Sequence, residues 1–193
     1  MTLASILSLA LFSCSKDKDD ASTLTTETPI QTILIGTTVF KETKIVTANV
    51  SVETGYKFSA KKAGKIAQLG CKFPIAGNVK VTLWDYETKE AIKTVTINVT
   101  DITKFIYVDI EDIAITANKN YVITLNNTID GMYKNFYSAT TINADEIPAY
   151  PFVSGSIEVK AAMYKQSPNT VFPIVEEAFA GYLTGMPDFV FEY

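Results

Sequence analysis

From residue 30 onward the chain is a succession of short segments rich in Val, Ile, Thr, Tyr and Phe, separated by turn-forming residues. The stretch Val79-Lys80-Val81-Thr82-Leu83-Trp84-Asp85 shows the pattern most clearly, because its apolar and polar residues largely alternate. A period of two places one face of a β-strand against a core and the other face away from it. No segment sustains the 3.6-residue apolar period of an amphipathic helix. The sequence therefore predicts sheets rather than helices.

Ten segments fit the strand pattern: residues 30–35, 44–52, 56–59, 66–73, 79–86, 91–99, 105–110, 121–126, 157–163 and 189–193. Turn signals such as Ala76-Gly77-Asn78 and Asp130-Gly131 separate several of them. Residues 176–182 are the one place where a helical turn is expected. Short strands at this spacing predict an all-β fold, an antiparallel β-sandwich or jelly-roll-like arrangement, in a single domain over residues 29–193.

The first residues predict export and anchoring. Residues 3–12 form an apolar run that is too short for a permanent membrane span but suits a signal peptide. The run ends in Leu11-Phe12-Ser13-Cys14, which resembles the lipobox of bacterial lipoprotein signals. The resemblance implies that residues 1–13 are removed and that Cys14 carries lipid, with the two-chain anchoring that one acyl chain does not supply.

The charged stretch that follows Cys14 indicates a tether. Ser15-Lys16-Asp17-Lys18-Asp19-Asp20 resembles the acidic segment behind the lipidated cysteine of Bacteroidetes lipoproteins. That resemblance implies an outer-membrane lipoprotein displayed at the cell surface. Residues 14–28 are then the lipid anchor and a flexible tether ahead of the folded domain.

Composition excludes several kinds of chemistry. All 17 basic residues are lysines, histidine is absent, and the net charge is −4 at pH 7. Without histidine, Ser-His-Asp and Cys-His catalysis in their usual forms are excluded, and the commonest zinc ligand is missing. Without arginine there is no bidentate fork for phosphate. An acidic chain with scattered lysines is not expected to bind nucleic acid.

Cys71 and the clustered acids carry weak signals. Cys71 lies in a strand-like segment with no histidine to activate it, so a small core residue is the expected role. Three groups of neighbouring acids suggest glycosidase chemistry, which needs two carboxyl groups at a fixed separation: Asp109/Glu111/Asp112, Asp145/Glu146 and Glu176/Glu177. Adjacent acids on a strand point to opposite faces, however, so no enzymatic site is predicted.

A family resemblance covers residues 53–125. It rests on Glu53-Thr54-Gly55-Tyr56-Lys57-Phe58, then Leu69-Gly70-Cys71-Lys72-Phe73, Val81-Thr82-Leu83-Trp84-Asp85 and Lys119-Asn120-Tyr121-Val122, in that order. This order resembles the domain-of-unknown-function family 4082, although Cys71-Lys72-Phe73 stands where that family has an arginine-aromatic ending. The resemblance implies a β-sandwich of secreted or surface proteins, often beside carbohydrate-active modules, and it transfers no catalytic residue. Residues 128–193 resemble no family.

Candidate ligand-binding residues gather in and after the Asn126 loop. Protein sites for sugars stack aromatic rings on sugar faces and add amide and carboxylate hydrogen bonds. Trp84 is either a platform of this kind or a residue that caps the edge of the core. The candidates are Trp84, Asn126, Asn127, Asp130, Tyr133, Asn135, Phe136, Tyr137 and Tyr150.

The same loop is a weak candidate for Ca²⁺, since residues 126–131 supply several oxygen ligands, but they lack a D-x-D-x-D-G pattern. No other cofactor and no metal site is predicted.

The sequence thus favours a surface-anchored, non-catalytic lipoprotein that binds a glycan outside the cell. A structural or adhesin-like lipoprotein that contacts another protein is the alternative, and a glycoside-processing enzyme is third. Clustered aromatic residues at loops would favour a glycan, whereas a flat apolar face or an unprotected strand edge would favour a protein.

Overall fold

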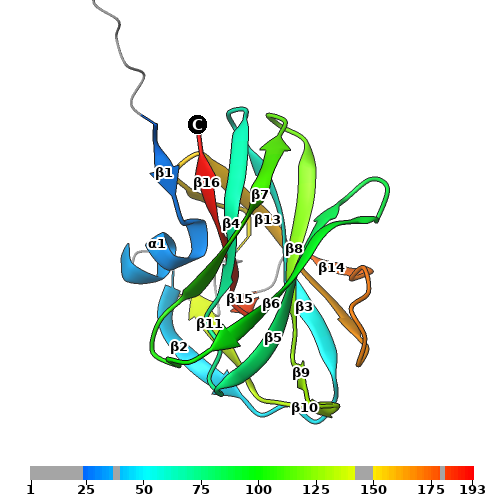
Figure 1. The fold of residues 1–193 in the computed structure, drawn as a ribbon. Coiled ribbons are helices and arrows are strands. Elements are labelled where there is room, and N and C mark those ends of the chain that lie inside the picture. Colours follow the sequence, from blue (N-terminus) through cyan, green and yellow to red (C-terminus); the bar gives the residue numbers. More distant parts are fainter. Residues whose placement is uncertain (1–23, 37–39, 142–149, 179–180) are drawn as a thin grey trace, which may run out of the picture.

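The computed structural model describes residues 24–36, 40–141, 150–178 and 181–193, and it is built almost entirely of antiparallel strands (Figure 1). The all-β sandwich expected from the sequence is confirmed. In chain order the elements are β1 (Thr26–Glu27), α1 (Pro29–Gly36), β2 (Phe40–Val46), β3 (Val52–Ala60), β4 (Gly64–Cys71), β5 (Gly77–Asp85), β6 (Ala91–Val99), β7 (Ile106–Ile115), β8 (Asn120–Asn126), β9 (Thr128–Ile129), β10 (Met132–Tyr133), β11 (Phe136–Thr141), β12 (Phe152–Ser154), β13 (Ile157–Gln166), β14 (Val175–Glu177), β15 (Tyr182–Thr184) and β16 (Pro187–Glu192).

One large sheet forms the first layer of the sandwich. Its strand order is β12-β13-β3-β8-β5-β6, and β14 pairs with β13 beside β12. The second layer consists of two smaller sheets, β1-β16-β4-β7 and β15-β11-β2. β9 and β10 form a separate hairpin. Because the second layer is divided, the region between its two sheets has to be filled by other parts of the chain.

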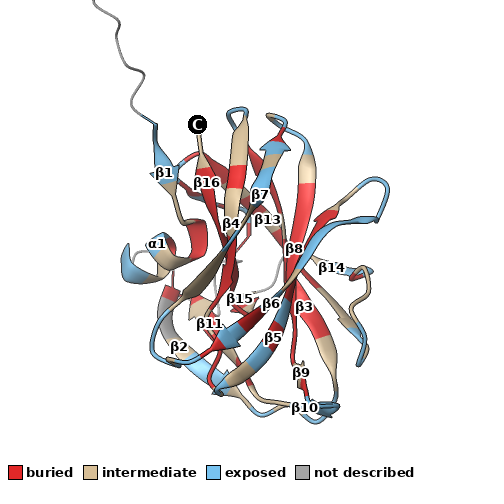
Figure 2. Cartoon of the chain, in the orientation of Figure 1, coloured by how far each residue is buried: buried red, intermediate tan, exposed pale blue. Residues whose placement is uncertain are grey.

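The core lies between the layers, where alternate side chains of each strand point inward (Figure 2). Tyr56 and Phe58 of β3 meet Phe189 of β16, and the rings of Phe58 and Phe189 are 4.7 Å apart. Phe40 of β2 packs edge-on against Phe152 of β12, with 5.2 Å between the ring centres. These contacts join the large sheet to both sheets of the second layer, so all three share one core.

Residues 30–35 form the helix α1 and not the predicted strand, so that prediction was wrong. Pro29 occupies the first helical position, where its fixed φ and missing N–H cost nothing. Ile30, Ile33 and Leu34 turn one side of the helix into the core. The cap of the helix comes from Asp188, which lies 158 residues beyond Ile30. A sequence rich in β-branched residues is thus held helical by a contact that no local pattern contains.

Most other predicted strands are present, and the differences are local. The segment 176–182 contains β14 and the start of β15, so the expected helical turn is not there in its described residues. The short strands β9, β10, β12, β14 and β15 and the longer β11 were not predicted. β1 lies inside the segment expected to be a tether, and it pairs with β16, so the folded part begins before Thr28. Across the described residues, no helix is long and apolar enough to cross a membrane.

Candidate functional site

One row of residues across the four-stranded sheet organises its outer face. Asp188 of β16, Gly70 of β4 and Tyr107 of β7 are in register with one another. A Cβ atom on Gly70 would lie 2.3 Å from the Tyr107 ring, so only glycine leaves room for that ring. Tyr107 therefore reaches across Gly70, and its hydroxyl lies 2.8 Å from Oδ2 of Asp188.

Asp188 fixes α1 against this face. Its carboxylate accepts the backbone N–H groups of Ile30 at 3.1 Å and Gln31 at 2.9 Å, as an N-cap side chain does. The carboxyl group is fully buried, and desolvation raises its pKa to about 6, while the hydrogen bonds from α1 and Tyr107 oppose the rise. Asp188 is thus a shared acceptor for the helix and for the neighbouring strand.

Tyr107 extends this network to Gln31. Its hydroxyl is 2.9 Å from Oε1 of Gln31 as well as near Asp188. A hydroxyl has one proton, so it donates to only one of these two oxygens at a time. Burial and the neighbouring Asp188 raise the pKa of Tyr107, which keeps the phenol protonated. Tyr107 therefore contacts the side chain of Gln31 and donates to it when its proton is not given to Asp188.

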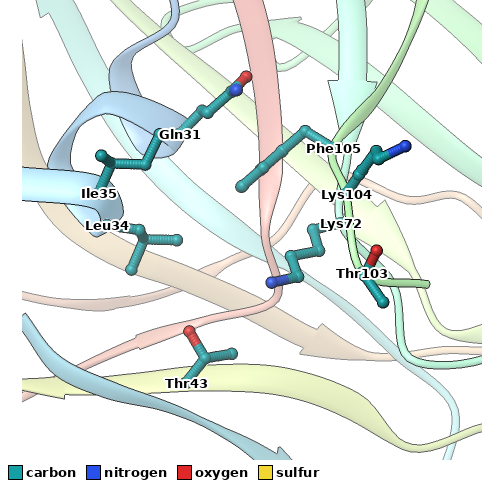
Figure 3. Close-up of a pocket in the computed structure, with 8 residues that line it drawn as sticks. All are labelled: Gln31, Leu34, Ile35, Thr43, Lys72, Thr103, Lys104 and Phe105. Carbon is teal, nitrogen blue, oxygen red and sulfur yellow. The ribbon is translucent and has the colours of Figure 1, made fainter. Parts of the chain in front are cut away.

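Beside Gln31, a pocket opens between α1, β2 and two loops (Figure 3). Its volume is about 350 Å³, which falls in the range of small-molecule sites, roughly 300–1,000 Å³. Four segments that are distant in sequence line it: Gln31, Leu34 and Ile35 from α1, Thr43 from β2, Lys72 after β4, and Thr103, Lys104 and Phe105 before β7.

The walls of the pocket combine apolar and polar groups. Leu34, Ile35 and the ring of Phe105 supply the apolar surface (Figure 3). Phe105 is held by Tyr107, whose ring is 6.2 Å away and nearly parallel. Hydroxyl, amide and ammonium groups supply the polar surface, and none of the described lining residues is an aspartate or glutamate. The pocket can therefore bind and orient a ligand, but its lining contains no pair of acids for hydrolysis.

A second, smaller hollow lies on the outer face of the large sheet. It has a volume of about 210 Å³ and is lined in part by Tyr86, Phe172 and Glu176. Glu176 forms an ion pair with Lys57 and accepts a hydrogen bond from the Tyr86 hydroxyl at 2.9 Å. Because its volume is below the usual range of ligand sites and Glu176 is already paired, the larger pocket is the better candidate.

Trp84 and Asn126, both predicted as ligand-binding, lie on that outer face but are buried. Trp84 is only 5% exposed, packs edge-on against Phe172, and donates its indole N–H to Thr124 at 2.8 Å. Asn126 donates to Glu53 at 2.9 Å and to backbone oxygens of the covering loop. Desolvation raises the pKa of Glu53, and hydrogen bonds from Thr124 and Asn126 oppose it. Because the side chain of Trp84 is covered, it is better described as a residue at the edge of the core than as a surface on which a sugar ring stacks.

Asn127 and Asn135 are committed to the backbone. Oδ1 of Asn127 accepts the N–H of Val52 at 2.7 Å, and its amide donates to the carbonyls of Val50 and Lys134. Oδ1 of Asn135 accepts the N–H of Ala48 at 3.1 Å. Both side chains hold loops together, and the fully buried amide of Asn127 is not presented to a ligand.

Asp130 and Tyr133 are exposed at the β9–β10 hairpin, where Asp130 has a positive φ of 51°. The Asn126 loop that was considered for Ca²⁺ continues into this hairpin. Among the described residues there is no group of three or more Cys, Asp or Glu that could hold a metal ion.

The remaining predicted aromatics are split between core and pocket. Phe136 and Tyr150 are buried in the core. Tyr137 lies under Lys72, with the ammonium 5.2 Å from the ring centre, and its hydroxyl donates to the carbonyl of Ile102 at 3.2 Å. Of the predicted ligand-binding residues, Tyr137 is thus the one that the structure brings against the pocket lining.

The clustered acids do not form a pair. Asp109 accepts a hydrogen bond from Gln68, and Asp112 forms an ion pair with Lys65. Glu177 accepts from the hydroxyls of Tyr164 and Tyr182, away from the Lys57 partner of Glu176. Asp145 and Glu146 lie outside the described residues, as does Cys14.

Cys71 is a buried core residue, as predicted. Its side chain is fully enclosed, and burial raises the pKa of the thiol to about 12. At neutral pH it is therefore protonated and unreactive.

Sequence reasoning missed most of the pocket. Gln31, Leu34, Ile35 and Phe105 were assigned to strands, and Thr43, Thr103 and Lys104 carry no motif. Lys72 was noted only as part of Cys71-Lys72-Phe73, which departs from the ending of the resembled family, and no binding role was predicted for it. Compared with known proteins, no protein-family model matches the chain and no curated protein matches it.

Proposed function

We propose that this chain is a non-catalytic module that binds a glycan outside the cell and is held at the outer membrane by lipid on Cys14. The observation that carries the binding role is the pocket between α1, β2 and the loops after β4 and before β7. It is the larger of the two hollows described above, and its shape is set by rigid elements: a capped helix and the ends of strands.

The lining suits a sugar better than a purely apolar ligand. A pyranose ring offers a C–H face, which packs on apolar or aromatic surface, and a rim of hydroxyls, which need hydrogen-bond partners. Leu34, Ile35 and Phe105 offer the first kind of surface. Gln31, Thr43 and Thr103 add amide and hydroxyl groups to the lining, which can act as donors and acceptors.

A protein partner is less well supported, although it is the second candidate. The edge strand β6 pairs only with β5, so it is one of the described edges that a partner strand could use. Its exposed positions include Lys93, Thr94 and Thr96. Polar and charged residues of this kind commonly protect an edge from pairing.

Binding to an array of neutral and acidic glycans, with and without calcium, tests the proposal. Calcium-independent binding that falls at least tenfold in Phe105→Ala is the expected result. Tyr133→Ala is the matched control, because it removes an exposed aromatic residue from the β9–β10 hairpin. If Tyr133→Ala abolishes binding and Phe105→Ala does not, the pocket is the wrong site. If the array stays silent, the glycan proposal fails and the protein partner takes its place.

Lipid anchoring is tested separately in cells. Cys14→Ala is expected to move the protein from the membrane fraction to a soluble fraction and to abolish labelling with a radioactive fatty acid. If the variant stays in the outer membrane and is still labelled, the anchor is not on Cys14.

A further inference from the structure

The charge of the pocket differs in sign from the charge of the protein. The chain carries a net charge of −4 at pH 7, yet among the described residues that line the pocket the charged ones are Lys72 and Lys104. Lys104 is largely exposed and is paired with Asp101 at 3.1 Å. In Figure 3 its ammonium group points away from the other lining residues.

Lys72 differs from Lys104 in its surroundings. Its ammonium group lies between Phe105 and Thr43 in Figure 3 and has no ion pair with any acid among the described residues. It lies over the face of Tyr137, 5.2 Å from the centre of the ring. A cation on an aromatic face is only partly compensated, because the ring carries no net charge.

Several contacts hold Lys72 in this place. Its backbone N–H donates to the carbonyl of Met186 at 3.0 Å, which fixes the base of the side chain. Tyr137, which supports the ammonium group, is itself tied to Ile102 in the loop that carries Thr103 and Lys104. The cation is therefore positioned before any ligand arrives, which lowers the entropic cost of binding.

We infer that the pocket selects an anionic saccharide, one whose carboxylate or sulfate group lies against the ammonium group of Lys72. The inference rests on the proposed glycan-binding function and adds the class of sugar. An ammonium group is a compact point charge without the planar fork of a guanidinium, so it accepts either anion. Thr43, which lies next to the Lys72 ammonium group in Figure 3, then contacts a hydroxyl of the same ring, while Phe105 and Leu34 cover its apolar face.

The test compares sugars that differ only in charge. Oligogalacturonate is titrated into the purified protein beside the same oligosaccharide with its carboxylates methyl-esterified, and a sulfated oligosaccharide is the second anion. Each is measured at low and at physiological salt with wild type, Lys72→Gln and Lys93→Gln. Lys93 lies on β6 and is exposed, so its replacement removes the same charge outside the pocket. Fluorescence of Trp84 checks that each variant is folded.

The inference predicts that at least one of the two anionic sugars binds to the wild type and that the methyl ester binds at least tenfold more weakly than the free acid. It also predicts that Lys72→Gln weakens binding of the anionic sugar at least tenfold. Lys93→Gln should leave that affinity unchanged. Equal binding of acid and ester, or an unchanged affinity in Lys72→Gln, overturns the anionic selection but leaves the glycan proposal standing. An equal loss in Lys93→Gln shows diffuse charge attraction and also overturns it. Failure of every sugar, neutral or charged, to bind overturns both.

Discussion

The carboxyl group of Asp188 gives the stability of this protein a specific dependence on pH. Its pKa in the folded protein is about 6, against an ordinary value of 3.8, because burial disfavours the charged form. Because the pKa is higher in the folded protein than in the unfolded chain, protonation of Asp188 adds to the free energy of unfolding. This contribution is fully present below pH 3.8 and is lost as the pH rises through about 6. A pKa that differs by one between the folded and unfolded states corresponds to about 1.4 kcal/mol, so the rise from 3.8 to about 6 is worth about 3 kcal/mol in total, of which roughly 2 kcal/mol is lost between pH 4 and pH 7.

Asp188→Asn removes this titration and keeps the shape of the side chain. The amide retains only one oxygen, so at pH 4 the variant is expected to be less stable by about 1 kcal/mol, the usual cost of a weakened helix cap. Between pH 4 and pH 7 the difference in unfolding free energy should then move by roughly 2 kcal/mol in favour of the variant.

The assay is urea unfolding followed by tryptophan fluorescence at pH 4, 5, 6 and 7. Trp84 is the single tryptophan and is buried, so its emission reports unfolding directly. Asp130→Asn is the control, since Asp130 is exposed and Asn tolerates the same positive φ. If the difference in unfolding free energy between the wild type and Asp188→Asn is the same from pH 4 to pH 7, the pKa of Asp188 is not raised in the folded protein. The conclusion that burial of this carboxylate is unfavourable is then refuted as well.

Three further changes test other parts of the structure. Glu53→Gln replaces a buried acceptor of two side-chain donors, and it is expected to cost about 2 kcal/mol in unfolding free energy and to shift Trp84 emission to the red, as measured by urea unfolding and fluorescence. Asn127→Ala removes three backbone contacts at a fully buried position, so a loss of about 3 kcal/mol is expected in the same assay. Cys71 is expected to resist iodoacetamide at pH 8 in the native protein and to react in 8 M urea, because its thiol pKa is raised to about 12; rapid native alkylation, read by mass spectrometry, would contradict this.

The sheet framework was predictable because its signal is local. The alternation in residues 79–85 belongs to β5, and residues 91–99 were predicted with the same bounds as β6. Strands that bury one face carry the period of two in their own sequence, so no knowledge of their partners is needed. The short strands β12, β14 and β15 have only three residues each, which is too few for a period to be seen.

The helix and the pocket depend on contacts between distant parts of the chain. Residues 29–36 have the composition of a strand, and the cap that stabilises them as a helix belongs to the last strand of the protein. The aromatic candidates around Tyr133 were chosen from a dense local cluster, yet Phe136 is drawn into the core and only Tyr137 reaches the pocket lining. Composition can show which side chains suit a sugar, but it does not show which of them the fold leaves accessible.

Gly70 shows why the fold and the pocket cannot be separated. Its missing side chain lets the Tyr107 ring cross β4, and that crossing brings the hydroxyl to both Asp188 and Gln31. Asp188 in turn holds the first turn of α1, from which Gln31 projects beside the pocket. The network that stabilises an atypical helix is therefore the same network that contacts a lining residue. A protonated Asp188 would donate a hydrogen bond to the Tyr107 oxygen, and the Tyr107 hydroxyl could then donate to Gln31. An ionised Asp188 would instead accept the hydrogen bond from the Tyr107 hydroxyl. The protonation state of Asp188 therefore decides whether Tyr107 donates its proton to the helix cap or to Gln31.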